Sequence, residues 1–182
     1  MKKKQHLVTK KGLHVTLRPA VEADAPSLLA ALNSVAAEEK YMLRSRFDRS
    51  EWADPAFIRQ VEEGGNLLLV AVHEGRVIGW LALARGAEEY IRHTADLMMG
   101  VVSEYRGQGL GSAMLEYALH WAREQGVEKI YISLRAGNER AFPFYAKHGF
   151  VEEGRRSKFV KTGEGCYEDF VVIARSVDSG AG

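Results

Sequence analysis

The chain has few of the features that disulfide bonds, metal sites or membrane spans require. Cys166 is the only cysteine among 182 residues, so no disulfide can form within the chain and a cysteine-rich zinc site is excluded. The longest apolar run, residues 67–72, is far shorter than the roughly 20 residues of a membrane-spanning helix. The formal net charge of +1 gives no overall field toward nucleic acid or a membrane. We therefore expect a cytoplasmic protein with no metal, nucleic-acid or membrane partner.

Composition and length are typical of one globular domain. Hydrophobic residues make up 46% of the chain and charged residues 27%. The basic stretch at residues 1–15 is not followed by an apolar segment, so we expect no signal peptide. No internal repeat or Pro/Gly/Ser-rich linker divides the chain. We expect a single domain over residues 1–182, with its core in about residues 13–175.

Apolar periodicity predicts about seven strands and four helices. The predicted strands cover residues 13–19, two runs within 66–86 separated by a turn at Glu74 and Gly75, 95–102, 129–134, 150–161 and 167–175. The predicted helices cover residues 21–39, about 54–63, 110–125 and 138–149. The strand–helix–strand segment over 95–134 predicts a parallel, right-handed crossover. The remaining strands favour antiparallel pairing, so the fold class is α/β (α+β), with a mixed, mostly antiparallel central sheet flanked by helices.

Three glycines stand where the third helix must begin. The stretch YRGQGLGSAML places Gly107, Gly109 and Gly111 at alternate positions, although glycine costs roughly 1 kcal/mol against alanine inside a helix. The free N–H groups of a helix N-terminus bind phosphate, and a loop without Cβ atoms lets the phosphate approach them. Arg106 could add charge-assisted hydrogen bonds. The pattern therefore indicates a pyrophosphate site, and a tight turn without a ligand is the alternative.

Two commoner glycine loops do not match. A P-loop needs Gly-Lys followed by Ser or Thr, and no lysine stands at that place. The G-x-G-x-x-G dinucleotide motif is out of register with these glycines. It also needs an acidic residue after the next strand, where this chain has Arg135.

Two motifs resemble the GNAT superfamily of N-acetyltransferases. Residues 106–111 match the pattern [RQ]-x-x-G-x-[GA]. Residues 138–150 resemble the pattern N-x-x-A-x-x-F-Y-x-x-x-G-F, and they match it at Asn138, Ala141, Phe144, Tyr145, Gly149 and Phe150. The expected order of elements resembles the family fold over about residues 13–175. The closing strands resemble those of the branch that acetylates amino acids, small amines or protein N-termini.

The resemblance implies acetyl-CoA as the cofactor and a binding surface on both motifs. Backbone N–H groups of residues 106–111 would bind the pyrophosphate, and the strand that ends near Val102 would pair with the pantetheine arm. That strand would splay from the strand at 129–134, and Asn138 would hydrogen-bond the pantetheine. The implied cofactor-binding residues are Val101, Val102, Arg106, Gly107, Gln108, Gly109, Leu110, Gly111, Ser112, Asn138, Phe144 and Tyr145.

The resemblance also implies direct transfer of the acetyl group from acetyl-CoA to a primary amine. Tyr145 would protonate the leaving thiolate, and a backbone N–H such as that of Val102 would polarise the thioester carbonyl. Asp96 and His93 are the candidate bases, and a chain of waters could serve instead. No covalent intermediate on the enzyme is needed, so no role for Cys166 is expected.

The acceptor is less constrained by the sequence. Glu38, Glu39 and Tyr41 stand where the family's acceptor site is often lined, and Arg44 and Arg46 could meet a substrate carboxylate. Small-molecule amines and peptides both remain open as acceptors, and so does homodimerisation through the exposed sheet edge. A non-catalytic acyl-CoA-binding regulatory module on the same fold is the main alternative function. An unrelated phosphate-binding protein is a further alternative.

Overall fold

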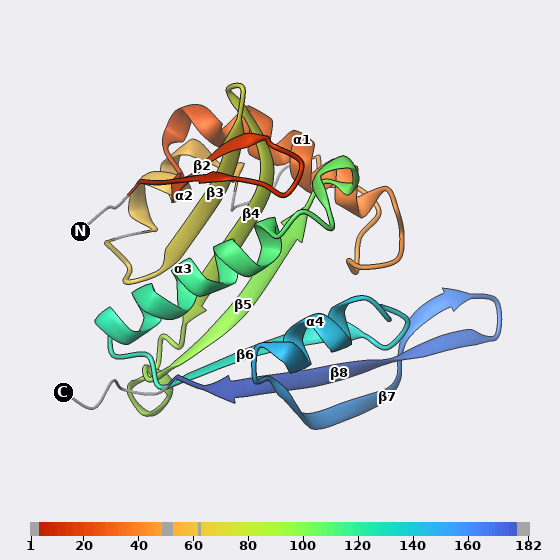
Figure 1. Ribbon diagram of the computed structural model, residues 1–182. Helices are drawn as coiled ribbons and strands as arrows, with labels where there is room; N and C mark the ends of the chain where they lie inside the picture. The colour runs from red at the N-terminus through yellow and green to blue at the C-terminus, as the bar shows by residue number, and fades with distance from the viewer. Residues whose placement is uncertain (1–3, 49–52, 62, 178–182) are drawn as a thin grey trace.

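One eight-stranded sheet organises the molecule (Figure 1). The computed structural model describes residues 4–48, 53–61 and 63–177. The strand order is β1-β2-β3-β4-β5-β6-β8-β7, and every neighbouring pair is antiparallel except β5 and β6. The strands are β1 (Gln5–Val8), β2 (His14–Pro19), β3 (Leu67–His73), β4 (Arg76–Arg85), β5 (Thr94–Val101), β6 (Lys129–Arg135), β7 (Val151–Gly163) and β8 (Cys166–Ser176). The mixed, mostly antiparallel sheet is confirmed, as is the parallel pair on either side of α3.

The expected number of strands was too low by one. β1 is a four-residue edge strand inside the basic N-terminal stretch, and its side chains are mostly exposed. Such a short, exposed strand carries little of the apolar alternation that identifies a strand in a sequence. It pairs with β2 and brings the turn between them, with Thr9 and Lys10, toward the glycine loop.

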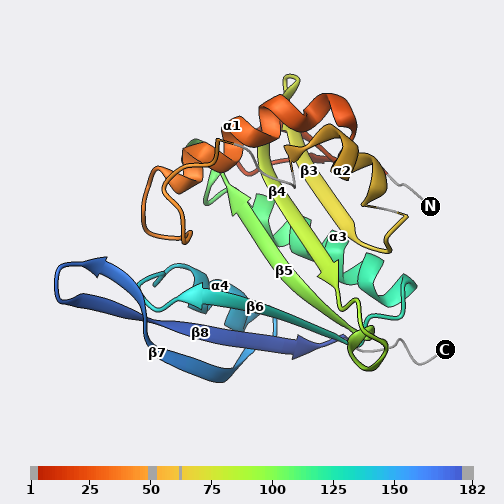
Figure 2. The same ribbon diagram turned by 180° about the vertical axis from the view of Figure 1, so that it is seen from behind.

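The expected four helices are present and cover both faces of the sheet. They are α1 (Ala25–Ala36), α2 (Pro55–Gln60), α3 (Leu110–Glu124) and α4 (Ala141–Lys147). α1 and α2 lie on one face, and α3 and α4 lie on the other (Figures 1 and 2). α1 is shorter than expected, because the preceding 3₁₀ turn Glu22–Asp24 is separate from it. α4 begins at Ala141 with Arg140 at its N-cap position, so it is shorter than the predicted 138–149, and Gly149 follows its end with a φ of +81°.

Two cores explain the long apolar runs. Leu69 and Leu81 pack with α3 on one face, while Val70 and Trp80 pack with α1 and α2 on the other. β3 and β4 are therefore buried on both faces, which is why their sequences are nearly continuously apolar.

The sheet separates into two arms between β5 and β6. These strands pair only between Thr94–Asp96 and Lys129–Tyr131, and beyond that point they diverge (Figures 1 and 2). The first arm contains β1 to β5, and the second arm contains β6, β8 and β7. Both diverging strand edges therefore leave backbone groups free to bind a ligand.

Candidate active site

A cavity of about 690 Å³ lies between the two arms. Its lining comes from α1 and the loop after it, β4, β5, the glycine loop, β6, α4 and β8. The predicted residues that line it are Tyr41, Val101, Arg106, Gly107, Gly109, Leu110, Gly111, Ser112, Asn138, Phe144 and Tyr145. The structure thus brings the two sequence motifs to one cavity, at the open end of the split sheet.

The glycine loop has the geometry that its sequence demands. Gly107 and Gly109 have φ angles of +72° and +90°, in the left-handed region that side chains with a Cβ disfavour. A Cβ built on either would meet nothing within 4 Å, so the space beside both is open. A Cβ built on Gly111 would lie 3.5 Å from the side chains of Met99 and Phe144, so the space beside this glycine is occupied.

Unpaired backbone donors surround this open space. Among the residues that the structure describes, no backbone carbonyl accepts a hydrogen bond from the N–H groups of residues 107–112, and the first bond of the helix runs from Ala113 N to Gly109 O at 3.1 Å. These donors and the positive end of the 15-residue α3 form a cradle for an anion. The residues present therefore fit a pyrophosphate.

Gln108 holds the loop in place. Its side chain is buried, its Oε1 accepts a hydrogen bond from Thr9 Oγ1 at 3.0 Å, and its Nε2 donates to Glu104 O at 3.2 Å. Its side chain therefore faces the β1–β2 turn and does not line the cavity. The side chain thus supports the cradle from behind, and the expected binding by the backbone N–H of Gln108 stays a prediction.

The side chain of Arg106 is also hydrogen-bonded within the protein. Its Nε donates to Val101 O at 2.7 Å, and its Nη1 donates to Glu38 Oε2 at 2.8 Å. A second contact joins Nη2 to Glu38 Oε1, and the guanidinium lies 5.1 Å from the centre of the Tyr41 ring. The Glu38 carboxylate raises the pKa of Arg106 above its usual range. The Arg106 side chain lines the cavity but binds Val101 and Glu38, so its contact with a pyrophosphate and an acceptor role for Glu38 both stay predictions.

The edge of β5 presents backbone N–H groups to the opening, but that of Val102 is not among them. Val102 N donates to Ile78 O at 3.0 Å, so the expectation that it polarises the thioester is wrong, and its side chain packs against the α1/α2 core. In an antiparallel pair, every second residue turns both backbone groups away from its partner strand. Because Val102 bonds to β4, the residues that turn away from β4 are the odd-numbered ones. The N–H groups of Met99 and Val101 therefore face the opening.

Tyr145 and Asn138 lie on the opposite side of the cavity. Tyr145 is 4% exposed and packs edge to face on Phe144 and Phe150, yet it lines the cavity. Burial raises its pKa well above the usual range, so its hydroxyl stays protonated. Asn138 lies in the loop between β6 and α4.

The two candidate bases have different places. Asp96 is partly buried where β5 and β6 separate, opposite Tyr131, and burial raises its pKa to about 6, against the lowering effect of a hydrogen bond from Leu97 N–H. It borders the cavity lining at Leu97 without belonging to it. His93 is exposed just before β5, at the end of that strand remote from the glycine loop, so the structure does not bring it to the cavity.

The loop at residues 37–48 crosses the opening and is fixed to both arms. Arg106 holds Glu38 on the first arm. Arg135, at the end of β6, is buried and donates to Glu39 O and, at 3.4 Å, to Met42 O, while Glu168 of β8 holds its other side at 2.9 and 3.1 Å. Asn33 of α1 binds both backbone groups of Phe47. Of the predicted acceptor residues, Tyr41 therefore lines the cavity, whereas Glu38 and Glu39 hold the loop.

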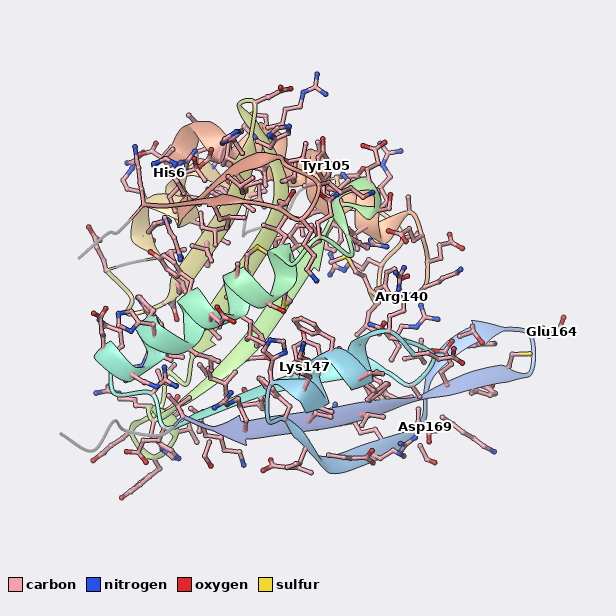
Figure 3. All side chains as sticks on the ribbon, in the orientation of Figure 1. His6, Tyr105, Arg140, Lys147, Glu164 and Asp169 are labelled. Carbon is pink, nitrogen blue, oxygen red and sulfur yellow. The ribbon has the colours of Figure 1, made fainter. Side chains whose placement is uncertain are left out.

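Several lining residues could not be found from the sequence. Lys10 comes from the β1–β2 turn, Phe170 from β8, and Met98 from a strand whose apolar residues all resemble core. Arg140 also lines the cavity, and Figure 3 shows it at the opening between the arms. Its place two residues after Asn138 was the only local feature that pointed to any of these residues. Lys10 and Arg140 add positive charge beside the cradle.

Two features are absent from the part of the chain that the structure describes. Over residues 4–48, 53–61 and 63–177, no three His, Cys, Asp or Glu side chains are grouped to hold a metal ion. Within the same ranges, no helix has the length and apolar character needed to cross a membrane. Cys166 is exposed at the tip of the β7–β8 hairpin and does not line the cavity.

Comparison with known proteins gives a consistent result. A model of the acetyltransferase (GNAT) family matches residues 31–150. The L-amino acid N-acetyltransferase AaaT of Escherichia coli is 31% identical over 122 residues, which are 64% of this chain and 72% of AaaT. A GNAT-family acetyltransferase from Streptococcus pneumoniae superimposes with a TM-score of 0.82 at 25% identity, covering 90% of this chain and 99% of that one. The phosphinothricin acetyltransferase of Sinorhizobium meliloti, solved with acetyl-CoA, shares the fold with a TM-score of 0.80 at 20% identity, covering 92% and 90%.

Proposed function

Because the chain belongs to the acetyltransferase (GNAT) family, we propose that it transfers an acetyl group from acetyl-CoA to a primary amine within the cavity between the two arms. The observation that carries this proposal is the open, donor-lined glycine cradle at the start of α3, which faces the split between β5 and β6. A non-catalytic module would need the cradle but would have no use for an opening on the acceptor side. A cytoplasmic location stays a prediction.

The backbone of residues 107–112 binds the pyrophosphate, with Lys10 and Arg140 as further cations beside it. Met99 and Val101 N–H groups on the β5 edge lie where they can pair with the pantetheine arm and donate to the thioester oxygen. Asn138 hydrogen-bonds the arm from the opposite side. When bound, acetyl-CoA supplies an activated acetyl group and a thiol leaving group.

Two side chains move the protons in this proposal. Asp96 accepts a proton from the acceptor's ammonium group, directly or through water, which frees the nitrogen lone pair for attack. Its pKa of about 6 still leaves it mostly ionised at neutral pH, and the raised value makes it a stronger base than an ordinary aspartate. Tyr145 donates its phenolic proton to the departing sulfur. The α-amine of a peptide N-terminus, with a pKa near 7.8, needs less help from such a base than a lysine amine near 10.4.

The test is a thiol-release assay with acetyl-CoA and a panel of amines, run with Tyr145→Phe. We expect kcat to fall about 100-fold in this variant, because general acid catalysis contributes at least that much, while CoA still raises the melting temperature. Tyr167→Phe is the matched control, since Tyr167 is exposed on the β7–β8 hairpin. Full turnover by Tyr145→Phe would remove the acid role. Thermal stabilisation by CoA without thiol release from any amine would favour the binding module.

A further inference from the structure

Among the residues that the structure describes, no acidic side chain lines the cavity. Its charged lining residues are Lys10, Arg44, Arg106 and Arg140, all basic. Polyamines and aminoglycosides carry several ammonium groups, and a site that selects them needs carboxylates to pair with those beyond the reacting amine. The lining therefore disfavours polycationic acceptors.

The wall on the α1 side of the opening is apolar. It is formed by Met42, Leu43, Phe47, Trp80, Met98 and Phe170. Met98 and Trp80 share this face because β5 residues alternate, with Leu97 on the α3 side, and because Ala82, the partner of Met98, belongs to the same core as Trp80. Phe170 joins them from the second arm, in register with Arg135. Such a wall suits an acceptor with a large apolar body.

Arg44 is an exposed residue that also lines the cavity. Within the described residues no carboxylate pairs with it, whereas Arg46 pairs with Asp48 at 3.2 Å. Its guanidinium lies 5.8 Å from the centre of the Phe47 ring. The loop that carries it is fixed by Arg106, Arg135 and Asn33, so Arg44 is presented to the cavity by a supported backbone.

We propose that the acceptor is a free α-amino acid with a large apolar side chain, its carboxylate bound by Arg44 and its side chain by the apolar wall. This inference rests on the proposed function. The α-nitrogen forms a bond to the acetyl carbon as the carbon–sulfur bond breaks. The ammonium nitrogen loses two protons in all: one is released through the base, and the other balances the proton that the leaving sulfur gains. The products are an N-acetylamino acid, free CoA and one proton.

The experiment compares L-phenylalanine with L-phenylalaninamide, which keeps the α-amine and the ring but lacks the carboxylate. Phe-Gly-Gly and spermidine complete the set, and thiol release is followed at one pH. In Arg44→Gln we expect KM for L-phenylalanine to rise about tenfold, because a charge-assisted pair is lost, and KM for the amide to change less than about twofold. Arg46→Gln, two residues away and paired with Asp48, should leave both unchanged.

The remaining outcomes separate this inference from the function on which it rests. Thiol release with spermidine or Phe-Gly-Gly but not with L-phenylalanine would overturn the amino-acid proposal and leave acetyl transfer standing. Equal effects of Arg44→Gln on the amino acid and its amide would also overturn it. Absence of thiol release with every amine would overturn both. Leu43→Asp offers a second check at an exposed lining position. The added carboxylate should raise KM for L-phenylalanine and lower KM for spermidine.

Discussion

The two sides of the cavity are built in different ways. The cofactor side is a nearly continuous stretch, residues 99–112, completed by residues 138–145, and it offers backbone N–H groups. The acceptor side draws side chains from α1, the 37–48 loop, β4, β5 and β8. A ligand bound by backbone demands glycine at defined places, whereas an apolar ligand is bound by residues that also suit a core. The cofactor site can therefore be predicted from a sequence pattern, whereas the apolar acceptor site cannot.

The largest effect should come from the junction of the two sides, where Asp96 lies. We expect Asp96→Asn to lower kcat about 100-fold, since it removes the general base, and to abolish the fall of kcat/KM below about pH 6. Rate–pH profiles of the parent and the variant measure this. Asp48→Asn, an exposed aspartate of the 37–48 loop, is the control. If kcat/KM of the variant still falls below about pH 6, Asp96 is not the base and water takes that role.

The same substitution has a signature in stability. The folded protein holds the Asp96 proton more tightly than the unfolded chain, so this group stabilises the fold below about pH 4 and loses that contribution as pH rises through about 6. Asp96→Asn should therefore gain stability relative to the parent at pH 8 but not at pH 4. Urea unfolding at the two pH values measures the difference.

A smaller effect should separate the cofactor side from the acceptor side. Gly109→Ala strains a left-handed residue and fills the cradle, so we expect CoA affinity to fall about 10- to 100-fold and stability to fall by about 1–2 kcal/mol. Gly165→Ala is matched to it, because Gly165 also has a positive φ and open space but lies in the β7–β8 turn. Titration calorimetry with CoA should show a loss only for Gly109→Ala. An equal loss in both would reduce the cradle to a strained turn.

The smallest effect tests whether the acceptor side depends on its loop. Arg135→Gln removes the link from β6 to Glu39 and Met42 and leaves Glu168 without its arginine partner, so we expect a loss of about 1–3 kcal/mol in stability and a rise of about fivefold in acceptor KM. CoA affinity should stay unchanged. Arg155→Gln, which breaks exposed pairs with Glu152 and Asp169, should cost under about 1 kcal/mol and alter no kinetic constant. Equal changes in CoA affinity and acceptor KM would contradict a separate acceptor side.

Much of the fold could be predicted because its signals are local. Asp54 caps α2, with its Oδ1 2.8 and 3.1 Å from the N atoms of Ala56 and Phe57, as its place before Pro55 indicates. Glu74 and Gly75 both have positive φ, as the predicted hairpin turn requires. β1 was missed because four exposed residues at a sheet edge leave no comparable pattern.

The side-chain roles within the glycine loop were harder to predict. Arg106 carries the charge expected of a phosphate ligand, yet Glu38, 68 residues earlier, holds it. Gln108 occupies a motif position but faces Thr9. A motif states which backbone positions must be small, while the direction of the larger side chains depends on partners elsewhere in the chain.

The amino-acid sequence by itself determined the strand and helix types, the glycine cradle and the family, because backbone conformation and apolar periodicity are set by neighbouring residues. Only the tertiary structure decided which partners the arginines around the cavity have among the described residues. Arg106 and Arg135 are consumed in fixing the 37–48 loop to the two arms, and Arg44 is left facing the cavity. The physical reason is that an ion pair forms between groups brought together by the fold, at separations in the chain that no local pattern records.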